Sequence, residues 1–132
     1  MLSRGADSTA GVWGHCDALL EVNLFKSWSE LHDAFKGFPG CDDGSFAETY
    51  SDSVVKLLAN EWDQLPKLKE LAKRDPSFRR FVLSHIDATT DFDELVRVVS
   101  AAGERCPPGE RTLCGEIHVA AGRAMIQVGR TW

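Results

Sequence analysis

The sequence lacks an apolar run long enough to span a bilayer. A membrane-spanning helix needs about 18 or more consecutive apolar residues, and no stretch of this chain approaches that length. The first eleven residues, MLSRGADSTAG, carry one arginine and no apolar core of the kind that a secretory signal requires. We therefore expect no membrane span. If the protein is exported, we expect its signal to be absent from the sequence as written.

The signatures of common catalytic and metal sites are missing as well. The chain has no CxxC pair, no HExxH helix, no GxSxG turn and no glycine-rich phosphate loop. These absences argue against a zinc ribbon, a thioredoxin-like redox centre, a serine hydrolase and a nucleotide-binding loop. The stretch CDDGSFAE at 41–48 lacks the alternating oxygen ligands of a calcium loop. We expect no cofactor and no bound metal.

Positive charge is scarce. The chain has 15 lysines and arginines against 20 aspartates and glutamates, which gives a formal net charge of −5. Nucleic acids and anionic membranes attract basic surfaces, so we expect neither as a partner. A basic patch at 67–80 is diluted by Glu70 and Asp75, and we interpret it as a solvated face. The net charge allows a basic or cationic partner, and a value this small is also ordinary for a soluble protein.

Helical patterns account for most of the chain. Apolar residues recur at about three- and four-residue spacings, which marks one face of a helix. Such patterns cover 28–38, 46–62, 65–72, 78–86, 92–102 and 113–124. We predict an all-α, single-domain orthogonal bundle of five or six short helices, formed by residues 12–132 after a disordered tail at 1–11. The segment 12–25 fits a short helix or an extended arm, and 125–128 is the one stretch with an alternative strand interpretation.

Helix starts are marked by capping residues and prolines. Ser27 with Glu30, and Ser45 with Glu48, fit the capping box in which a hydroxyl and a carboxylate satisfy orphan backbone N–H groups. Thr90 resembles the start of another such box. Pro66, and Pro76 after an N-capping Asp75, suit the first turn of a helix. The central helix, with Ser45 at its start, is expected to end near residue 63.

The four cysteines, Cys16, Cys41, Cys106 and Cys114, allow two disulfides whose connectivity the sequence leaves open. Cys106 and Cys114 flank a Pro-Pro-Gly turn and could form a short bridge, while Cys41 could instead reach either of them. Disulfides are typical of oxidising compartments, so we expect a periplasmic or otherwise exported protein. Four reduced thiols in a cytoplasmic protein are the alternative.

Two groups of side chains are candidate sites. Asp42, Asp43, Glu48 and His85 would form an acid/base or metal cluster if their two helix junctions meet, with Asp87 close by. The same residues also suit helix ends, where charges complement the helix dipole. The second group comprises the acids at the start of the 92–102 helix, which could dock a basic partner: Asp87, Asp91, Asp93 and Glu94.

Three stretches carry a resemblance to known proteins. CDDGSFAETYSDSVVKLLA, FRRFVLSHIDAT and CPPGERTLC together resemble a group of small helical bacterial proteins of uncharacterised function, over about residues 38–118. An acidic helical domain with cysteines at its helix junctions is also similar to periplasmic immunity proteins, which bind and neutralise antibacterial toxins such as secreted amidases. The resemblance implies a class and a compartment, and it carries over no functional residue.

We therefore expect a protein-binding module, an immunity or inhibitor protein that neutralises a cognate bacterial toxin. The alternative is a small enzyme or metal-binding protein that uses Asp42, Asp43 and His85. A third hypothesis is a structural or dimerisation module, in which two copies of the chain exchange the N-terminal arm that includes the segment 12–25.

Overall fold

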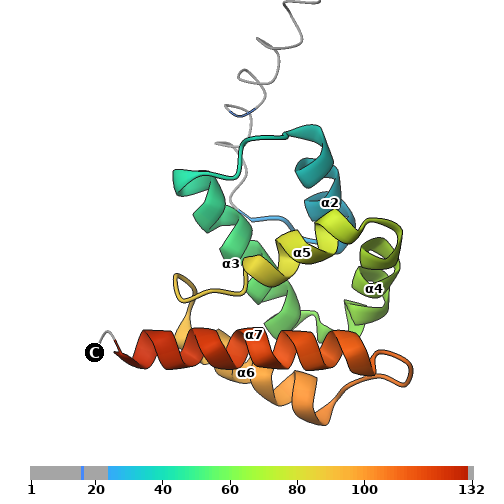
Figure 1. Cartoon of the computed structure of the whole chain (residues 1–132), viewed down its shortest axis with the longest axis vertical. Helices are drawn as coiled ribbons and strands as arrows, with labels where there is room; N and C mark the ends of the chain where they lie inside the picture. Colours follow the sequence, from blue (N-terminus) through green and yellow to red (C-terminus); the bar gives the residue numbers. More distant parts are fainter. Residues whose placement is uncertain (1–15, 17–23, 131–132) are drawn as a thin grey trace, which may run out of the picture.

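The computed structural model describes residues 16 and 24–130 of the chain (Figure 1). These residues form six α-helices and one short 3₁₀ helix, and they contain no strand. The elements are α2 (Trp28–Gly37), α3 (Gly44–Asn60), η2 (Trp62–Gln64), α4 (Leu65–Arg74), α5 (Pro76–Ser84), α6 (Phe92–Glu104) and α7 (Arg111–Arg130). The predicted all-α bundle is confirmed, and residues 125–128 lie inside α7.

The N-terminal predictions fall largely outside these ranges. The expected disordered tail at 1–11 and most of the segment 12–25 lie outside the described residues. Phe25 is described and buried, and its backbone N–H donates to Ser53 Oγ of α3 at 3.0 Å. None of the described helices combines the length and apolar character needed to cross a bilayer.

The helices pack as a crossed bundle around a shared core. α6 and α7 form a pair along one side of the molecule, and α2–α5 pack on the other side (Figure 1). α3 contacts both α2 and α6, so it links the two halves. Every helix contributes to the core, whose largest fully buried side chains include Trp28, Leu31, Val54, Leu58, Leu68, Phe78, Val82, Leu95 and Ile117. Burial of these apolar side chains supplies the main driving force for folding.

Three of the predicted helix starts are confirmed. Ser27 Oγ accepts from the Glu30 N–H at 3.1 Å and caps α2, while Asp75 Oδ1 accepts from the Phe78 N–H at 3.2 Å and caps α5. Pro66 lies in the first turn of α4, where its missing N–H costs no helical hydrogen bond. These starts depend on residues within one helical turn.

The other two predicted caps are wrong. α3 begins at Gly44 with Asp43 as N-cap and no side-chain capping bond, so Ser45 lies inside the helix. Gly44 has φ +54°, a conformation that glycine adopts without strain and that lets the helix begin before the serine. α6 is capped by Asp91, whose Oδ1 accepts from the Asp93 N–H at 2.8 Å. Thr90 instead donates to a backbone carbonyl of the preceding turn.

The buried face of α6 also differs from the prediction. The apolar pattern predicts burial of Phe92, Leu95, Val96, Val99 and Ala102. The structure buries Glu94, Leu95, Val98, Ala101 and Ala102 and leaves Phe92 and Val96 exposed. α6 packs against both α7 and α3, so its buried face is wider and rotated toward α3.

Two disulfides cross-link the chain. Cys16 pairs with Cys41 and Cys106 pairs with Cys114, with Cα–Cα distances of 5.6 and 6.0 Å that are usual for disulfides. The predicted short bridge between Cys106 and Cys114 is confirmed. The alternative, in which Cys41 pairs with one of these two residues, is wrong. Two such bridges indicate an oxidising environment of the kind that exported proteins meet.

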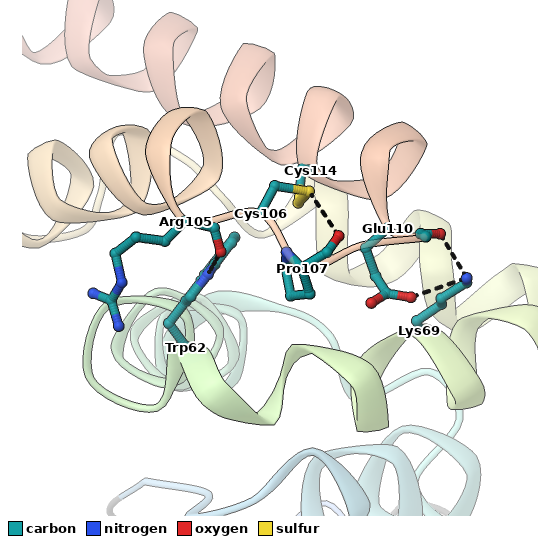
Figure 2. The surroundings of a disulfide bond; sticks show 8 residues. Trp62, Lys69, Arg105, Cys106, Pro107, Glu110 and Cys114 are labelled. Carbon is teal, nitrogen blue, oxygen red and sulfur yellow. Dashed lines mark hydrogen bonds and ion pairs between the residues drawn. A yellow bond between two sulfur atoms is a disulfide. The ribbon is translucent and has the colours of Figure 1, made fainter.

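The second disulfide closes the turn between α6 and α7 (Figure 2). At the start of this turn, Trp62 Nε1 donates to the Arg105 carbonyl at 2.8 Å. At its end, Lys69 Nζ donates to the Gly109 carbonyl at 2.7 Å and pairs with Glu110 at 2.9 Å. Contacts from η2 and α4 therefore fix both ends of the turn against the body of the protein.

Candidate functional site

The two helix junctions of the predicted acid/base cluster do meet. His85 Nε2 lies 2.9 Å from Asp42 Oδ2, although the two residues are 43 positions apart. His85 caps the end of α5 and is 5% exposed, whereas the Asp42 side chain is 43% exposed. Asp43 and Glu48 are exposed, and neither bonds to His85 in the described part of the chain. The cluster thus reduces to one histidine–carboxylate pair.

A buried serine extends this pair on its inner side. Ser51 Oγ lies 2.7 Å from His85 Nδ1 and 2.7 Å from Asp87 Oδ2. The result is a chain of four polar side chains, Asp42–His85–Ser51–Asp87. It joins α3 to the turn before it and to the segment that follows α5. A hydroxyl has a single hydrogen, so Ser51 donates to one neighbour at a time and can accept from Nδ1 when it donates to Asp87.

These residue types match those of a nucleophilic site, but their placement does not. Ser51 is 2% exposed, and its hydroxyl is already within hydrogen-bonding distance of two partners. The His85 ring is packed against Phe81 and Tyr50, with centroid distances of 4.5 and 5.8 Å. A substrate could not approach the serine without opening this packing. The chain of hydrogen bonds therefore acts as a clamp between α3 and α5.

Metal ligands are not gathered in this region. Within residues 16 and 24–130, no group of three or more histidine, cysteine, aspartate or glutamate side chains is arranged to hold a metal ion. A zinc or calcium site normally offers at least three protein ligands. The geometry therefore gives no support to the metal-binding alternative.

Sequence reasoning missed Ser51, although a signal was present. Ser51 directly follows Tyr50 and precedes Val55 by one helical turn, so it lies on the buried face of α3. Buried hydroxyl groups are nearly always hydrogen-bonded, which predicts a polar partner from another element. The identity of that partner, His85, depends on tertiary packing and could not be read from spacing.

An aromatic pocket lies directly beside the histidine–carboxylate pair. It has a volume of about 270 Å³ and is lined by four aromatic side chains, the turn after α2 and one carboxylate: Phe35, Phe38, Tyr50, Phe81, Pro39, Gly40 and Asp42. The Phe81 ring contacts the rings of Phe35 and Tyr50, with centroids 4.7 and 5.0 Å apart. The pocket thus combines aromatic walls with one exposed acid at its edge.

The pocket contains a phenol, that of Tyr50, beside the carboxylate of Asp42. Burial, and secondarily the negative charge of Asp42, raise the pKa of the Tyr50 phenol to about 12. The phenol is therefore neutral throughout the physiological range, and Asp42 supplies the negative charge of the pocket. A neutral aromatic surface beside one carboxylate suits a positively charged, partly apolar ligand.

Tyr50 is expected to ionise late in an alkaline titration of the folded protein. It is the one tyrosine of the sequence, so the ultraviolet absorbance of tyrosinate reports this residue alone. Its pKa is raised from 10.0 in the unfolded reference to about 12 in the folded state. The unfolded chain therefore ionises first, and the contribution of Tyr50 to stability is full below pH 10 and falls by about 2 to 3 kcal/mol as the pH approaches 12.

The control for this titration is Asp42→Asn, which should bring the pKa of Tyr50 part of the way back toward 10.0. Circular dichroism at each pH would show that the helices are still folded. A pKa near 10.0 for Tyr50 in the folded wild-type protein would contradict its buried position beside Asp42.

The predicted acidic binding residues are only partly exposed. Glu94 was expected on the surface, but it is buried, and its Oε2 pairs with Lys56 Nζ of α3 at 2.7 Å. The cause is the rotated face of α6, which turns Glu94 toward α3. Asp91 and Asp93 are exposed, as expected, and Asp87 is half-buried and bonded to Ser51. Glu94 is therefore removed from the set of exposed contact residues.

Two acids of α3 that sequence reasoning did not assign to this surface enlarge it. Burial raises the pKa of Asp52, and the charges of Glu94, Glu48 and Asp87 add to this effect, while Lys56 opposes it. The spacing Glu48–Asp52–Lys56 places these three residues on one face of the helix, which was a readable signal. We call Glu48, Asp52, Asp87, Asp91 and Asp93 together the acidic surface.

Charge on the acidic surface is poorly compensated, in contrast to the basic face. None of its five carboxylates forms an ion pair with a cation in residues 24–130. On the basic face, by contrast, Lys67 and Arg74 pair with Glu70, and Arg79 pairs with Glu116. Most cations of the basic face are therefore paired within the protein. The acidic surface has only the nearby charge of Lys56 to offset its carboxylates, so it has negative charge available to a partner.

No protein-family model, curated protein or solved structure matches the chain. The resemblance to small bacterial helical proteins and to periplasmic immunity proteins therefore stays a prediction. The roles assigned to these residues rest on their contacts, exposure and charge.

Proposed function

We propose that the protein is an exported protein-binding module that docks onto a basic surface of its partner, as an immunity or inhibitor protein would. The observation that carries this proposal is the acidic surface, whose five carboxylates form no ion pair with a cation in residues 24–130. Hydrogen bonds continue from this surface through Asp87, Ser51 and His85 to Asp42, which lines the aromatic pocket. The two disulfides support an exported setting.

The carboxylates of this region interact with one another, although Lys56 pairs with Glu94. Glu94 lies behind the acidic surface, and its Oε1 has no hydrogen-bond partner among the described residues. Asp52 is close enough to Glu94, Glu48 and Asp87 for their charges to raise its pKa. A basic partner would relieve this repulsion, so association would gain electrostatic energy as well as a faster encounter.

The enzyme alternative has less support. The predicted site comprised Asp42, Asp43 and His85, and Asp43 does not bond to His85 in the described part of the chain. Ser51 would be the nucleophile beside His85, but it is enclosed by the core. A binding protein needs only a rigid surface, and the hydrogen-bonded clamp helps to provide one. We therefore assign Asp42 and His85 to the positioning of a binding surface.

The test is a comparison of two double charge reversals with equal changes in net charge. Glu48→Lys with Asp93→Lys alters exposed residues of the acidic surface, and Asp63→Lys with Glu104→Lys alters exposed acids elsewhere. The wild-type protein would first be used to capture a stoichiometric partner from the exported fraction of its native cells. The binding of that partner to the wild type and to both variants would then be measured by titration. We expect the first variant to bind about tenfold more weakly and the second to bind like the wild type.

Rising salt should weaken the wild-type complex, because exposed charges are screened over about 10 Å at 0.1 M salt. An inhibitor role further requires the partner's activity to fall in proportion to complex formation. Equal binding by the two variants, or the retention of no protein at all, would refute the proposed function.

A further inference from the structure

We propose that the aromatic pocket beside Asp42 binds one cationic side chain of the partner, a lysine ammonium or an arginine guanidinium. This inference rests on the proposed function and names the group that the pocket would take. It is drawn from three features of the pocket: its walls, its charge and its rigidity.

The walls suit an alkyl chain that ends in a cation. Phe35, Phe38, Tyr50 and Phe81 supply aromatic surface, and a cation within about 6 Å of a ring centre is attracted by the ring quadrupole. Pockets for drug-sized ligands typically occupy about 300 to 1,000 Å³, so a volume of about 270 Å³ fits a single side chain better. The methylene groups of lysine or arginine would pack on the rings while the charged end meets Asp42.

Asp42 retains the capacity to bind such a group. The carboxylate has two acceptor oxygens, and the described contact from His85 uses Oδ2. The side chain is 43% exposed, so a ligand can reach it from solvent. Tyr50 stays neutral because burial raises the pKa of its phenol to about 12. Among the described lining residues, the ligand would thus meet one carboxylate and no lysine or arginine.

The pocket is built before any ligand arrives. On one side, the Phe38 N–H donates to the Ala34 carbonyl at 2.9 Å and the Cys41 N–H donates to the Phe38 carbonyl at 3.2 Å. Gly40, at φ +82°, makes the turn that a bulkier residue would strain. The Cys16–Cys41 disulfide anchors the end of this turn. Because the pocket is held rigid, little conformational entropy is lost on binding.

The experiment titrates the full-length, disulfide-intact protein with small probes. Butylammonium and butylguanidinium represent the two cations, and pentan-1-ol is a neutral analogue of similar length. The ring resonances of Tyr50, the one tyrosine, report binding by NMR. We expect at least one cation to bind with a roughly millimolar dissociation constant and the alcohol to bind at least about tenfold more weakly. The stronger of the two cations identifies the side chain.

Three variants test the assignment to this pocket. Asp42→Asn keeps an acceptor for His85 but removes the charge, and Phe38→Ala removes a half-buried wall. We expect each change to weaken cation binding by about tenfold. Asp63→Asn alters an exposed acid outside both the pocket and the acidic surface and should leave probe binding unchanged. Circular dichroism would show that every variant is folded.

Failure of this inference is distinguishable from failure of the proposed function. If cations bind no better than the alcohol, or if Asp42→Asn binds them normally, the pocket assignment is refuted even where a basic partner still docks on the acidic surface. If the probes behave as expected but charge reversal of the acidic surface has no effect on partner binding, the proposed function fails and the cation site stands.

Discussion

Replacing Cys16 and Cys41 together with serine is expected to lower the free energy of unfolding by about 3.5 kcal/mol. A disulfide restricts the unfolded chain, and in the chain-entropy model its effect grows with the length of the closed loop. The two residues are 25 positions apart, which gives this estimate. Domains of this kind are typically stable by about 5 to 15 kcal/mol, so the loss is a large part of the total.

The second disulfide provides the matched control. Cys106 and Cys114 are 8 positions apart, and the same model gives a loss of about 2.5 kcal/mol for their double serine variant. Denaturant unfolding of the two variants under identical conditions would measure the difference. Equal losses would show that loop entropy does not govern them, and a smaller loss for the Cys16–Cys41 pair would contradict the expected order.

The two variants should also differ in ligand binding. Cys41 directly precedes Asp42 and ends the turn that forms one side of the aromatic pocket. The other disulfide closes the α6–α7 turn (Figure 2). No residue of that turn is among the described residues that line the pocket. At temperatures where both variants are folded, we expect cation binding to weaken only when the Cys16–Cys41 bridge is lost. Equal binding would show that the bridge does not hold the pocket in shape.

Features set by residues close together in the sequence could be predicted, and features set by residues far apart could not. The caps at Ser27 and Asp75 depend on backbone groups three residues away, so local spacing was enough to identify them. The burial of Glu94 depends on Lys56, which lies 38 positions earlier on another helix. From the apolar pattern a glutamate is expected to be exposed, because burial of an unpaired charge is costly. The pattern does not show that Lys56 pairs with Glu94 and so compensates for its burial.

The candidate site shows the same limit. The sequence placed Asp42 and His85 in one possible cluster because both lie at helix junctions, and the structure brings them into contact. The aromatic residues beside them were interpreted as parts of buried helical faces, which is correct for Tyr50 and Phe81. Whether one edge of such a face stays uncovered depends on the path of the 38–43 turn. Residue spacing contains no information on that path, so the pocket could not be predicted.

Replacing Phe78 with alanine is expected to lower the free energy of unfolding by about 4 kcal/mol. Phe78 is fully buried on α5, and its ring contacts His32 and Phe35 of α2, with centroid distances of 4.7 and 5.5 Å. Truncation would remove this link between the helices and leave a cavity that the rigid surroundings fill only in part.

The control is Phe38→Ala, the same chemical change at a half-buried position. Its loss should be about 1 kcal/mol, because less apolar surface leaves water there on folding. Denaturant unfolding followed by tryptophan fluorescence would measure both values. Similar losses for the two variants would contradict the burial of Phe78, and a loss below about 2 kcal/mol for Phe78→Ala would show that the core collapses into the cavity.

The same pair of variants separates folding from binding. Phe78 does not line the aromatic pocket, but it packs against Phe35 and lies 6.0 Å from the Phe81 ring, and both of these residues form pocket walls. We therefore expect Phe78→Ala to reduce stability strongly and to weaken cation binding only through looser walls. Phe38→Ala should weaken binding by about tenfold with little loss of stability. If instead the loss of cation binding is proportional to the loss of stability in both variants, the pocket is not a separate binding site.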